Sequence, residues 1–316
     1  MANNTKSVGR KNHRAVSYNK WGYIFLIPFF SVYVIFSLVP LVLTFARSFT
    51  QYYKDGRTWV GPIWVGFENF VKLFSDSRIW DYFVNTMIIW VVGFIPQILV
   101  SLLLASWFSD TRFKIKGEGF FKTVIYLPNL IMAASFAMLF YSLFNSHGAI
   151  TNLVVSWGWA ESGFSFFDTV WGSRLLVGLI NFLMWFGNTT ILLMAGIMGI
   201  DVSLYEAAEV DGANSKQRFW KITMPLLKPI FIYVFITSLI GGIQMFDIPA
   251  IITNNAGTPD IAGKHTMMTL IMYLRQTLTS RDYGTSGALS VILFLITGAL
   301  SLIVYRIMYS KKSREA

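Results

Sequence analysis

The sequence predicts an all-α membrane protein with six transmembrane helices. Of its 316 residues, 54% are hydrophobic and only 13% are charged, whereas soluble domains average about 25% charged residues. The apolar residues gather in blocks near the roughly 20 residues that a helix needs to cross a bilayer. We place the six blocks at about residues 21–45, 82–108, 121–144, 174–200, 229–252 and 285–310.

Taken in order, these blocks form one membrane domain. The first is much longer than the roughly 7–15 residues of a signal-peptide core and is expected to be an anchor. The fifth is interrupted by Gly241-Gly242 and Pro249, which loosen a helix. The outer connections, residues 46–81, 145–173 and 253–284, are long enough for short surface helices. We expect a basic tail over 1–20, the six-helix domain over 21–310 with a loop at 201–229, and a second tail over 311–316.

The distribution of charge predicts the orientation. The net charge is +10. With six spans, both tails and the loops after the second and fourth spans share one face, and that face carries the whole excess. Basic residues concentrate on the cytoplasmic side of membrane proteins, which puts both termini in the cytoplasm. The basic tail therefore reads as a topology signal, and no nucleic-acid partner is expected.

Several chemistries are disfavoured. The chain has no cysteine, and its three histidines, His13, His147 and His265, lie on three different segments, so we predict no metal site and no catalytic residues. The sequence also lacks the Gly-x-x-x-x-Gly-Lys-Ser/Thr phosphate loop. We expect a transporter in a cell membrane, not an enzyme.

The loop at 201–229 is the most informative segment. Ser203 and Glu206 fit a capping box, and Gly212 suits a left-handed helix end. Asn214 or Ser215 can cap a second helix, which we expect to stop before Pro225, with Pro229 opening the fifth span. A helix this short needs packing to hold it. Spacing alone leaves open whether its partner is lipid or another protein.

The motif within this loop resembles a known family. Glu206-Ala-Ala-x-x-x-Gly212 followed by Ile222-x-Met224-Pro225 is similar to the Glu-Ala-Ala loop of permease subunits in binding-protein-dependent ABC importers. The longer string Tyr205–Ala213 looks like the carbohydrate branch, of the first-permease type that serves maltose or glycerol 3-phosphate. The family has Leu where Met224 stands, a volume-conserving change. Its glycine-rich outer turn appears here, altered, at 253–259. Further support comes from Pro28, Pro40, Gly66–Phe70, Tyr126-Leu-Pro128 and Phe246-Asp247-Ile248.

The resemblance implies a type I importer fold and a set of partners. It implies a second permease subunit, two cytoplasmic ATPase subunits that carry ATP and Mg²⁺, and an extracytoplasmic solute-binding protein. This chain would hold no cofactor. It would lie in a bacterial or archaeal cytoplasmic membrane and dock on the ATPases through the loop. The residues carried over for this contact are Glu206, Ala207, Ala208, Asp211, Gly212, Ile222 and Pro225.

Polar residues within the spans are candidates for a solute path, because they usually face other helices or a wet cavity. For Asn85, Gln97 and Asn129 we favour interhelical hydrogen bonds. The fourth and fifth spans flank the loop, and by resemblance they carry sugar contacts. Trp185 and Phe246 could stack on a sugar ring. The predicted path residues are Trp185, Asn188, Thr189, Gly242, Gln244, Met245, Phe246 and Asp247.

Two alternatives remain open. A secondary transporter needs a relay of charges in the membrane, and within the spans Asp247 is nearly alone. An ABC importer for a non-sugar solute, such as a polyol or glycerol phosphate, shares the loop. Phosphate esters favour Arg or Lys in the cavity, and the fourth and fifth spans have only Arg174, at a boundary. A neutral polyhydroxylated solute fits better.

Overall fold

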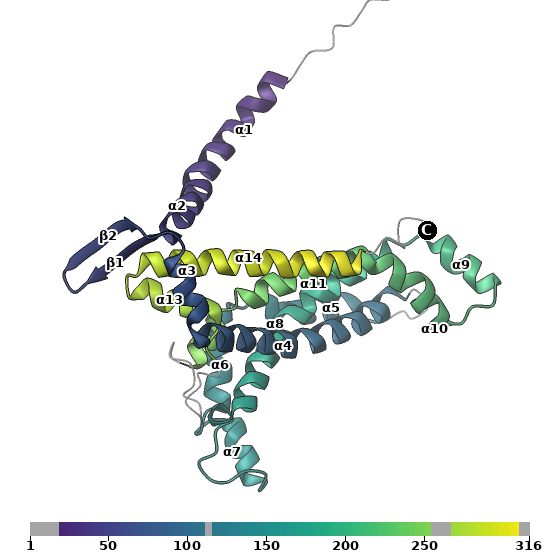
Figure 1. The fold of residues 1–316 in the computed structure, drawn as a ribbon. Helices are drawn as coiled ribbons and strands as arrows, with labels where there is room; N and C mark the ends of the chain where they lie inside the picture. Colours follow the sequence, from purple (N-terminus) through teal and green to yellow (C-terminus); the bar gives the residue numbers. More distant parts are fainter. Residues whose placement is uncertain (1–18, 111–115, 254–266, 310–316) are drawn as a thin grey trace, which may run out of the picture.

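The computed structural model describes residues 19–110, 116–253 and 267–309. Most of both predicted tails, and the part of the predicted outer turn at 254–259, lie outside these residues. The described chain is mainly helical, and its long helices lie side by side in a bundle (Figure 1).

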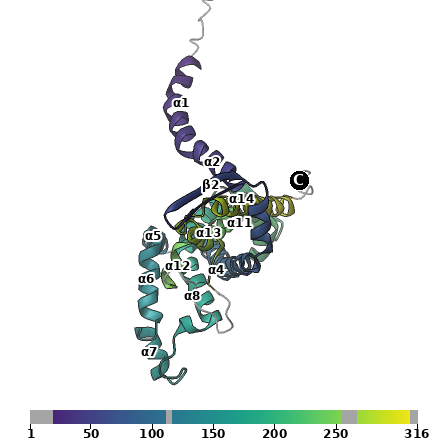
Figure 2. The same cartoon turned by 60° about the vertical axis from the view of Figure 1, so that its left-hand side comes forward.

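The first predicted span is confirmed as a long helical arm. It comprises α1 (Asn19–Tyr33), a π-turn (Val34–Leu38) and α2 (Val39–Ser48). The π-turn comes just before Pro40, which lacks a backbone N–H and crowds the preceding turn. The arm leaves the bundle at its α2 end (Figures 1 and 2), and no residue of its most apolar stretch is buried.

A β-hairpin follows, which the sequence reading did not predict. Strands β1 (Thr50–Asp55) and β2 (Thr58–Trp64) pair antiparallel. The rings of Tyr52 and Trp59 stack with their centroids 5.4 Å apart, and Tyr283 of the last helix stacks on both. These contacts attach the hairpin to the bundle.

The second and fourth spans form the centre of the bundle. A short helix, α3 (Glu68–Ser75), leads into α4 (Ser77–Ser109), which packs along α8 (Val170–Met198). Gly93 of α4 allows close approach, since a Cβ there would lie 3.0 Å from the Gly178 carbonyl oxygen of α8.

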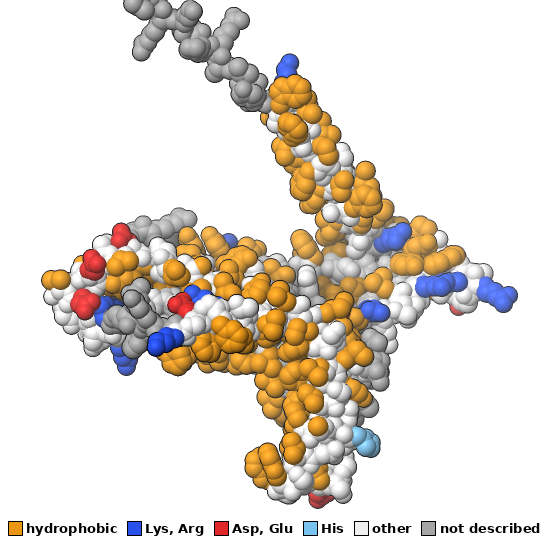
Figure 3. Space-filling model, turned by 180° about the vertical axis from the view of Figure 1, so that it is seen from behind, with side chains coloured by type: hydrophobic (Ala, Val, Ile, Leu, Met, Phe, Trp, Pro, Cys, Tyr) orange, Lys and Arg blue, Asp and Glu red, His pale blue; other side chains and the backbone are white. Residues whose placement is uncertain are grey.

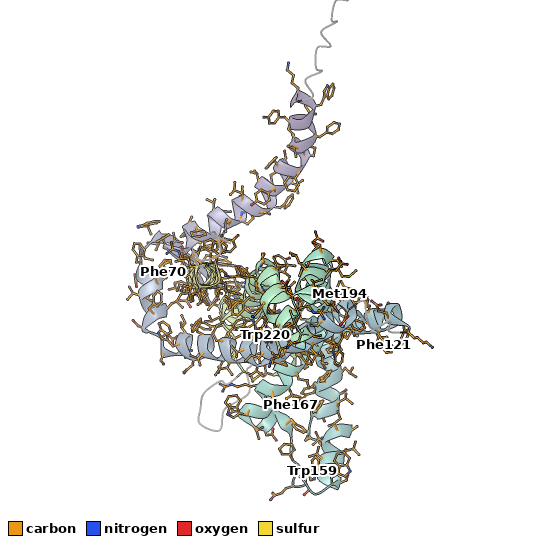
Figure 4. All side chains as sticks on the ribbon, turned by 90° about the vertical axis from the view of Figure 1, so that its right-hand side faces the viewer. Phe70, Phe121, Trp159, Phe167, Met194 and Trp220 are labelled. Atoms are coloured by element: carbon orange, nitrogen blue, oxygen red, sulfur yellow. The ribbon has the colours of Figure 1, made fainter. Side chains whose placement is uncertain are left out.

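The third predicted span is not a single straight helix. It consists of α5 (Glu118–Leu130) and α6 (Ala133–Phe144), and α6 continues through a short turn into α7 (Ala149–Ser156). The break at Ile131 and Met132, whose ψ angles are 135° and 130°, bends the pair by 91°. As a result α6 and α7 project from the bundle, with Trp159 beyond the end of α7 (Figures 1 and 4).

The fifth span is interrupted, as predicted, but its start differs. After α9 (Val202–Val210), helix α10 (Ser215–Arg218) runs through a π-turn (Phe219–Thr223) into α11 (Met224–Ile243). The expectation that the loop helix stops before Pro225 was wrong. The wide π-turn, in which the Met224 N–H donates to the Phe219 carbonyl, admits the proline without ending the helix. Pro229 lies inside α11.

The chain ends with α12 (Asp247–Ile252), α13 (Leu270–Thr279) and α14 (Tyr283–Met308). Five helical stretches of the described residues are long and apolar enough to cross a membrane, or six if the bent pair counts as one span. The six predicted blocks are therefore confirmed, the third as a bent pair. Hydrophobic side chains cover the length of the bundle, and charged ones gather at the end that carries α9 and α10 (Figure 3).

Candidate functional site

A cavity lies between α4, α8 and α11. Its volume is about 210 Å³. Four of the predicted path residues line it: Trp185, Asn188, Thr189 and Gly242. The other lining residues are Gln97, Asn181, Leu192, Tyr233, Val234, Thr237, Ser238 and Gly241. None of these twelve side chains carries a charge.

Helical spacing explains why these residues converge. On α8, Asn181, Trp185 and Asn188 follow one another at intervals of four and three, so they share one face. On α11, Tyr233, Thr237 and Gly241 follow at intervals of four. Trp185 and Tyr233 are 45% and 57% exposed, so both rings are free to contact a solute.

Hydrogen bonds fix the polar wall of the cavity. The Gln97 Nε2 donates to Thr189 Oγ1 at 2.7 Å, and Trp90 Nε1 donates to Ser238 Oγ at 3.1 Å. Gly242 is required beside Trp90, because a Cβ there would lie 2.2 Å from the indole ring. The buried Gln97 Oε1 makes no hydrogen bond within the described residues. It is an acceptor available to a hydroxyl group or to water.

The interhelical role predicted for three polar residues is confirmed. Asn85 accepts from Arg174 at 2.6 Å and donates to the Met268 carbonyl. Asn129 donates to the Met184 carbonyl at 3.1 Å, which ties α5 to α8. Gln97 bonds across to α8 in the same way, although it also lines the cavity.

The remaining predicted path residues lie around the break between α11 and α12. Met245 is buried in the core, and its carbonyl accepts from Thr269. Gln244 is exposed and lines a second, more apolar cavity beside α13 and α14. Phe246 lies under the guanidinium of Arg275, 4.7 Å from the ring centroid. Asp247 is exposed. The structure does not bring these four into the main cavity.

The loop at 201–229 has a well-defined form at the far end of the bundle (Figure 1). The capping box predicted for Ser203 and Glu206 was wrong. Helix α9 is capped two residues earlier by Asp201, whose carboxylate accepts from the Ser203 N–H at 3.0 Å. This hydrogen bond lowers the pKa of the Asp201 carboxyl, so the cap is ionised at neutral pH.

The end of α9 is as predicted. Gly212 has a φ of +80°, in the left-handed region. The Ala213 N–H donates to the Ala208 carbonyl and the Gly212 N–H to the Glu209 carbonyl, the bonding pattern of a Schellman motif. The second helix is then capped by Asn214, which forms a capping box with Gln217.

The predicted docking residues are mostly accessible. Glu206, Ala207, Asp211, Gly212 and Pro225 are exposed. Ala208 and Ile222 are half-buried and face the body of the protein. Glu206 forms no ion pair or hydrogen bond with another described side chain, so its carboxylate is free to meet a partner. The docking role of these residues stays a prediction.

Comparisons with known proteins identify relatives. The sequence profile of a family described as binding-protein-dependent transport system inner membrane components matches residues 97–314. The chain is 29% identical to the lactose transport system permease LacF of Rhizobium radiobacter, over 94% of this chain and 96% of that protein. It is also 29% identical to the multiple sugar-binding transport system permease MsmF of Streptococcus mutans, over 95% and 98%.

A solved structure has the same fold. It is the bacterial alginate ABC transporter in complex with an alginate pentasaccharide-bound periplasmic protein. One chain of that structure superposes with a TM-score of 0.74 at 22% identity, covering 94% of this chain and 97% of that one.

Proposed function

This chain belongs to the family of binding-protein-dependent transport inner-membrane components and is a multi-pass protein of the cell membrane; we propose that it is the membrane-spanning subunit of an ATP-driven sugar importer. The solute, an oligosaccharide, would pass from an extracytoplasmic binding protein through the cavity into the cytoplasm. LacF and MsmF, similar along nearly their whole length, are both sugar permeases by name.

The observation that carries the proposal is the chemistry of the cavity. Its lining offers amide and hydroxyl groups, such as Asn188 and Thr237, beside the exposed rings of Trp185 and Tyr233. Sugars are bound through hydroxyl hydrogen bonds and through apolar ring faces, which need both kinds of group. A phosphorylated or acidic solute would need a cation there, and none of the twelve described lining residues is one. Arg174 is held against Asn85 instead.

Energy would enter through the loop. ATP and Mg²⁺ would bind on two separate ATPase subunits. Each ATPase would bind the loop of one permease subunit. The permease relatives of this chain are not enzymes themselves, and the division of labour suits a sequence without a phosphate loop. Closure of the ATPases would move the loop and, through the continuous helix 215–243, the wall of the cavity.

A second permease subunit would complete the pathway. The α1–α2 arm supports this idea, because its apolar side chains are exposed along their length while only the α2 end packs on α14. An isolated apolar helix in a bilayer gains packing by lying against another protein. We expect the arm to pack on that second subunit.

The test is reconstitution of the four-subunit assembly in vesicles with its binding protein. Asn188→Ala should weaken sugar-stimulated ATP hydrolysis and uptake, because the cavity loses a hydrogen-bonding group. Ser142→Ala, on the α6 arm away from the cavity, is the matched control. Equal uptake by the Asn188→Ala and control assemblies would count against this cavity as the path. Uptake by the chain alone, driven by an ion gradient, would favour a secondary transporter instead.

A further inference from the structure

Two side-chain contacts attach helix α9 to the next helix of the described chain. None of its nine residues is buried. The Tyr205 hydroxyl lies 2.9 Å from Thr223 Oγ1. The Glu209 Oε2 lies 2.7 Å from Arg218 Nη1. A helix of this length is marginal by itself, so its orientation depends on these contacts.

Both contacts end on well-fixed groups of the next helix. Thr223 is only 5% exposed and sits in the π-turn that opens α11. The Arg218 side chain is 12% exposed, whereas that of Glu209 is 68% exposed. Because one partner is largely withdrawn from water, the ion pair is less weakened by solvent than a pair exposed at both ends.

The two contacts also divide α9 into two faces. Ala208 and Glu209 come three and four residues after Tyr205. The three residues therefore share the face toward α10 and the π-turn. Glu206 flanks this face and Ala207 lies opposite it, and both are exposed. The two glutamates of α9 therefore differ. Glu209 forms an ion pair within the chain, whereas Glu206 forms none with another described side chain.

We propose that Tyr205 and Glu209 are positioning residues, which join α9 to the 215–243 helix as one rigid lever. This inference rests on the proposed function of the loop. Motion imposed on α9 passes through Thr223 and Arg218 to α11, and α11 carries Tyr233 and Thr237 into the cavity wall. Without the two contacts, α9 moves with the ATPase and α11 does not follow.

The experiment measures ATP hydrolysed per sugar transported, in vesicles that contain the whole importer and its binding protein. The variants are Glu209→Gln, Tyr205→Phe and the exchange Glu209→Arg with Arg218→Glu. Glu68→Gln, which removes an ion pair to Lys72 on α3, is the matched control. The amount of assembled complex is measured for each, because loss of assembly alone would leave the ratio unchanged.

We expect the ratio of ATP to sugar to rise about fivefold, the effect of roughly 1 kcal/mol, for Glu209→Gln and Tyr205→Phe. The exchanged pair should return toward the original ratio, and the control should not differ. An unchanged ratio in Glu209→Gln and Tyr205→Phe, or an exchanged pair as uncoupled as Glu209→Gln, would overturn the lever.

The same assay separates this inference from the proposal beneath it. Glu206→Gln should lower binding of the ATPase. Combining Glu206→Arg with Arg218→Glu should not restore that binding. If Glu206→Gln and Gly212→Val both transport normally, the coupling role of the loop is wrong. If Glu206→Gln and Gly212→Val lose transport while Glu209→Gln and Tyr205→Phe keep the original ratio of ATP to sugar, only the proposed lever is wrong.

Discussion

Gly212 offers the most direct perturbation of the loop. Its φ of +80° is a conformation that L-residues with a side chain adopt at a cost of roughly 1–2 kcal/mol. A Cβ placed there would meet no atom within 4 Å, so backbone strain is the whole effect. A cost of that size corresponds to about a 5- to 30-fold change in population. Gly212→Val should therefore reduce the population of correctly folded loop by about this factor.

The assay compares sugar uptake with ATP hydrolysis in the same vesicle preparation. For Gly212→Val we expect uptake to fall about 5- to 30-fold while the chain still inserts in the membrane. Gly212→Asn is the matched variant, because Asn tolerates the left-handed region better than other residues, and it should recover much of the uptake. Normal uptake by Gly212→Val at normal abundance would contradict an effect of backbone strain on coupling. So would an Asn variant as impaired as the Val variant, since strain would then not be the cause.

Three further substitutions test separate parts of the account. Gly242→Ala should destabilise the assembly by about 1–3 kcal/mol, the usual cost of overpacking, because the new Cβ meets Trp90 at 2.2 Å. Thermal unfolding in detergent measures this loss of stability, and an unchanged midpoint would contradict the close packing of Gly242 on Trp90. Asn129→Leu should cost only about 0.6 kcal/mol, typical of a membrane hydrogen bond, and leave uptake intact; lost uptake at normal stability would place Asn129 in the path. Asp201→Ala should loosen α9, whereas Asp201→Asn should keep the cap. Hydrogen exchange of the α9 amides measures this, and equal protection of these amides in the two variants would rule out the cap.

The Asp201 cap also has a defined pH dependence. Its folded-state pKa lies below the ordinary carboxyl value of 3.8. A carboxyl with a lowered pKa contributes stability that is present above the unfolded pKa and is lost as the pH falls through the folded one. Order in α9 should therefore be constant through the neutral range and fall only in acid below that value. Loss of protection between pH 5 and 7 would contradict this assignment.

Hydropathy located the membrane segments well but not their breaks. A run of apolar residues satisfies the length criterion whether it is straight or bent. In the third segment Leu130 to Ala133 are all apolar, and the bend comes from the extended backbone of Ile131 and Met132, which hydropathy does not report. In the fifth segment, Gly241-Gly242 and Pro249 did mark the interruption.

Two local errors have identifiable causes. The β-hairpin had an available signal, the Asp55-Gly56 pair between runs rich in Tyr, Thr, Trp and Val, which favours a tight turn between strands. The cap of α9 was placed at Ser203 because the capping-box pattern also fits there. Asp201 is an equally good cap, and the choice depends on where the helix starts.

The candidate path was predicted in part. Trp185, Asn188, Thr189 and Gly242 line the cavity, because polar and small residues of spans four and five face each other. Tyr233 and Thr237 were missed, although their spacing along α11 could have indicated a shared face. Met245 lies in the break between α11 and α12, where the direction of a side chain cannot be extrapolated from helical spacing.

Neutral-sugar import by this chain is best tested by measuring binding-protein-stimulated ATP hydrolysis and uptake in the reconstituted importer. The measurement uses a panel of neutral oligosaccharides alongside acidic and phosphorylated sugars of similar size. We predict that a neutral sugar stimulates hydrolysis and accumulates inside the vesicles, and that accumulation falls strongly in the Gly212→Val assembly. Stimulation only by acidic or phosphorylated solutes, or uptake that continues without ATP, would contradict it.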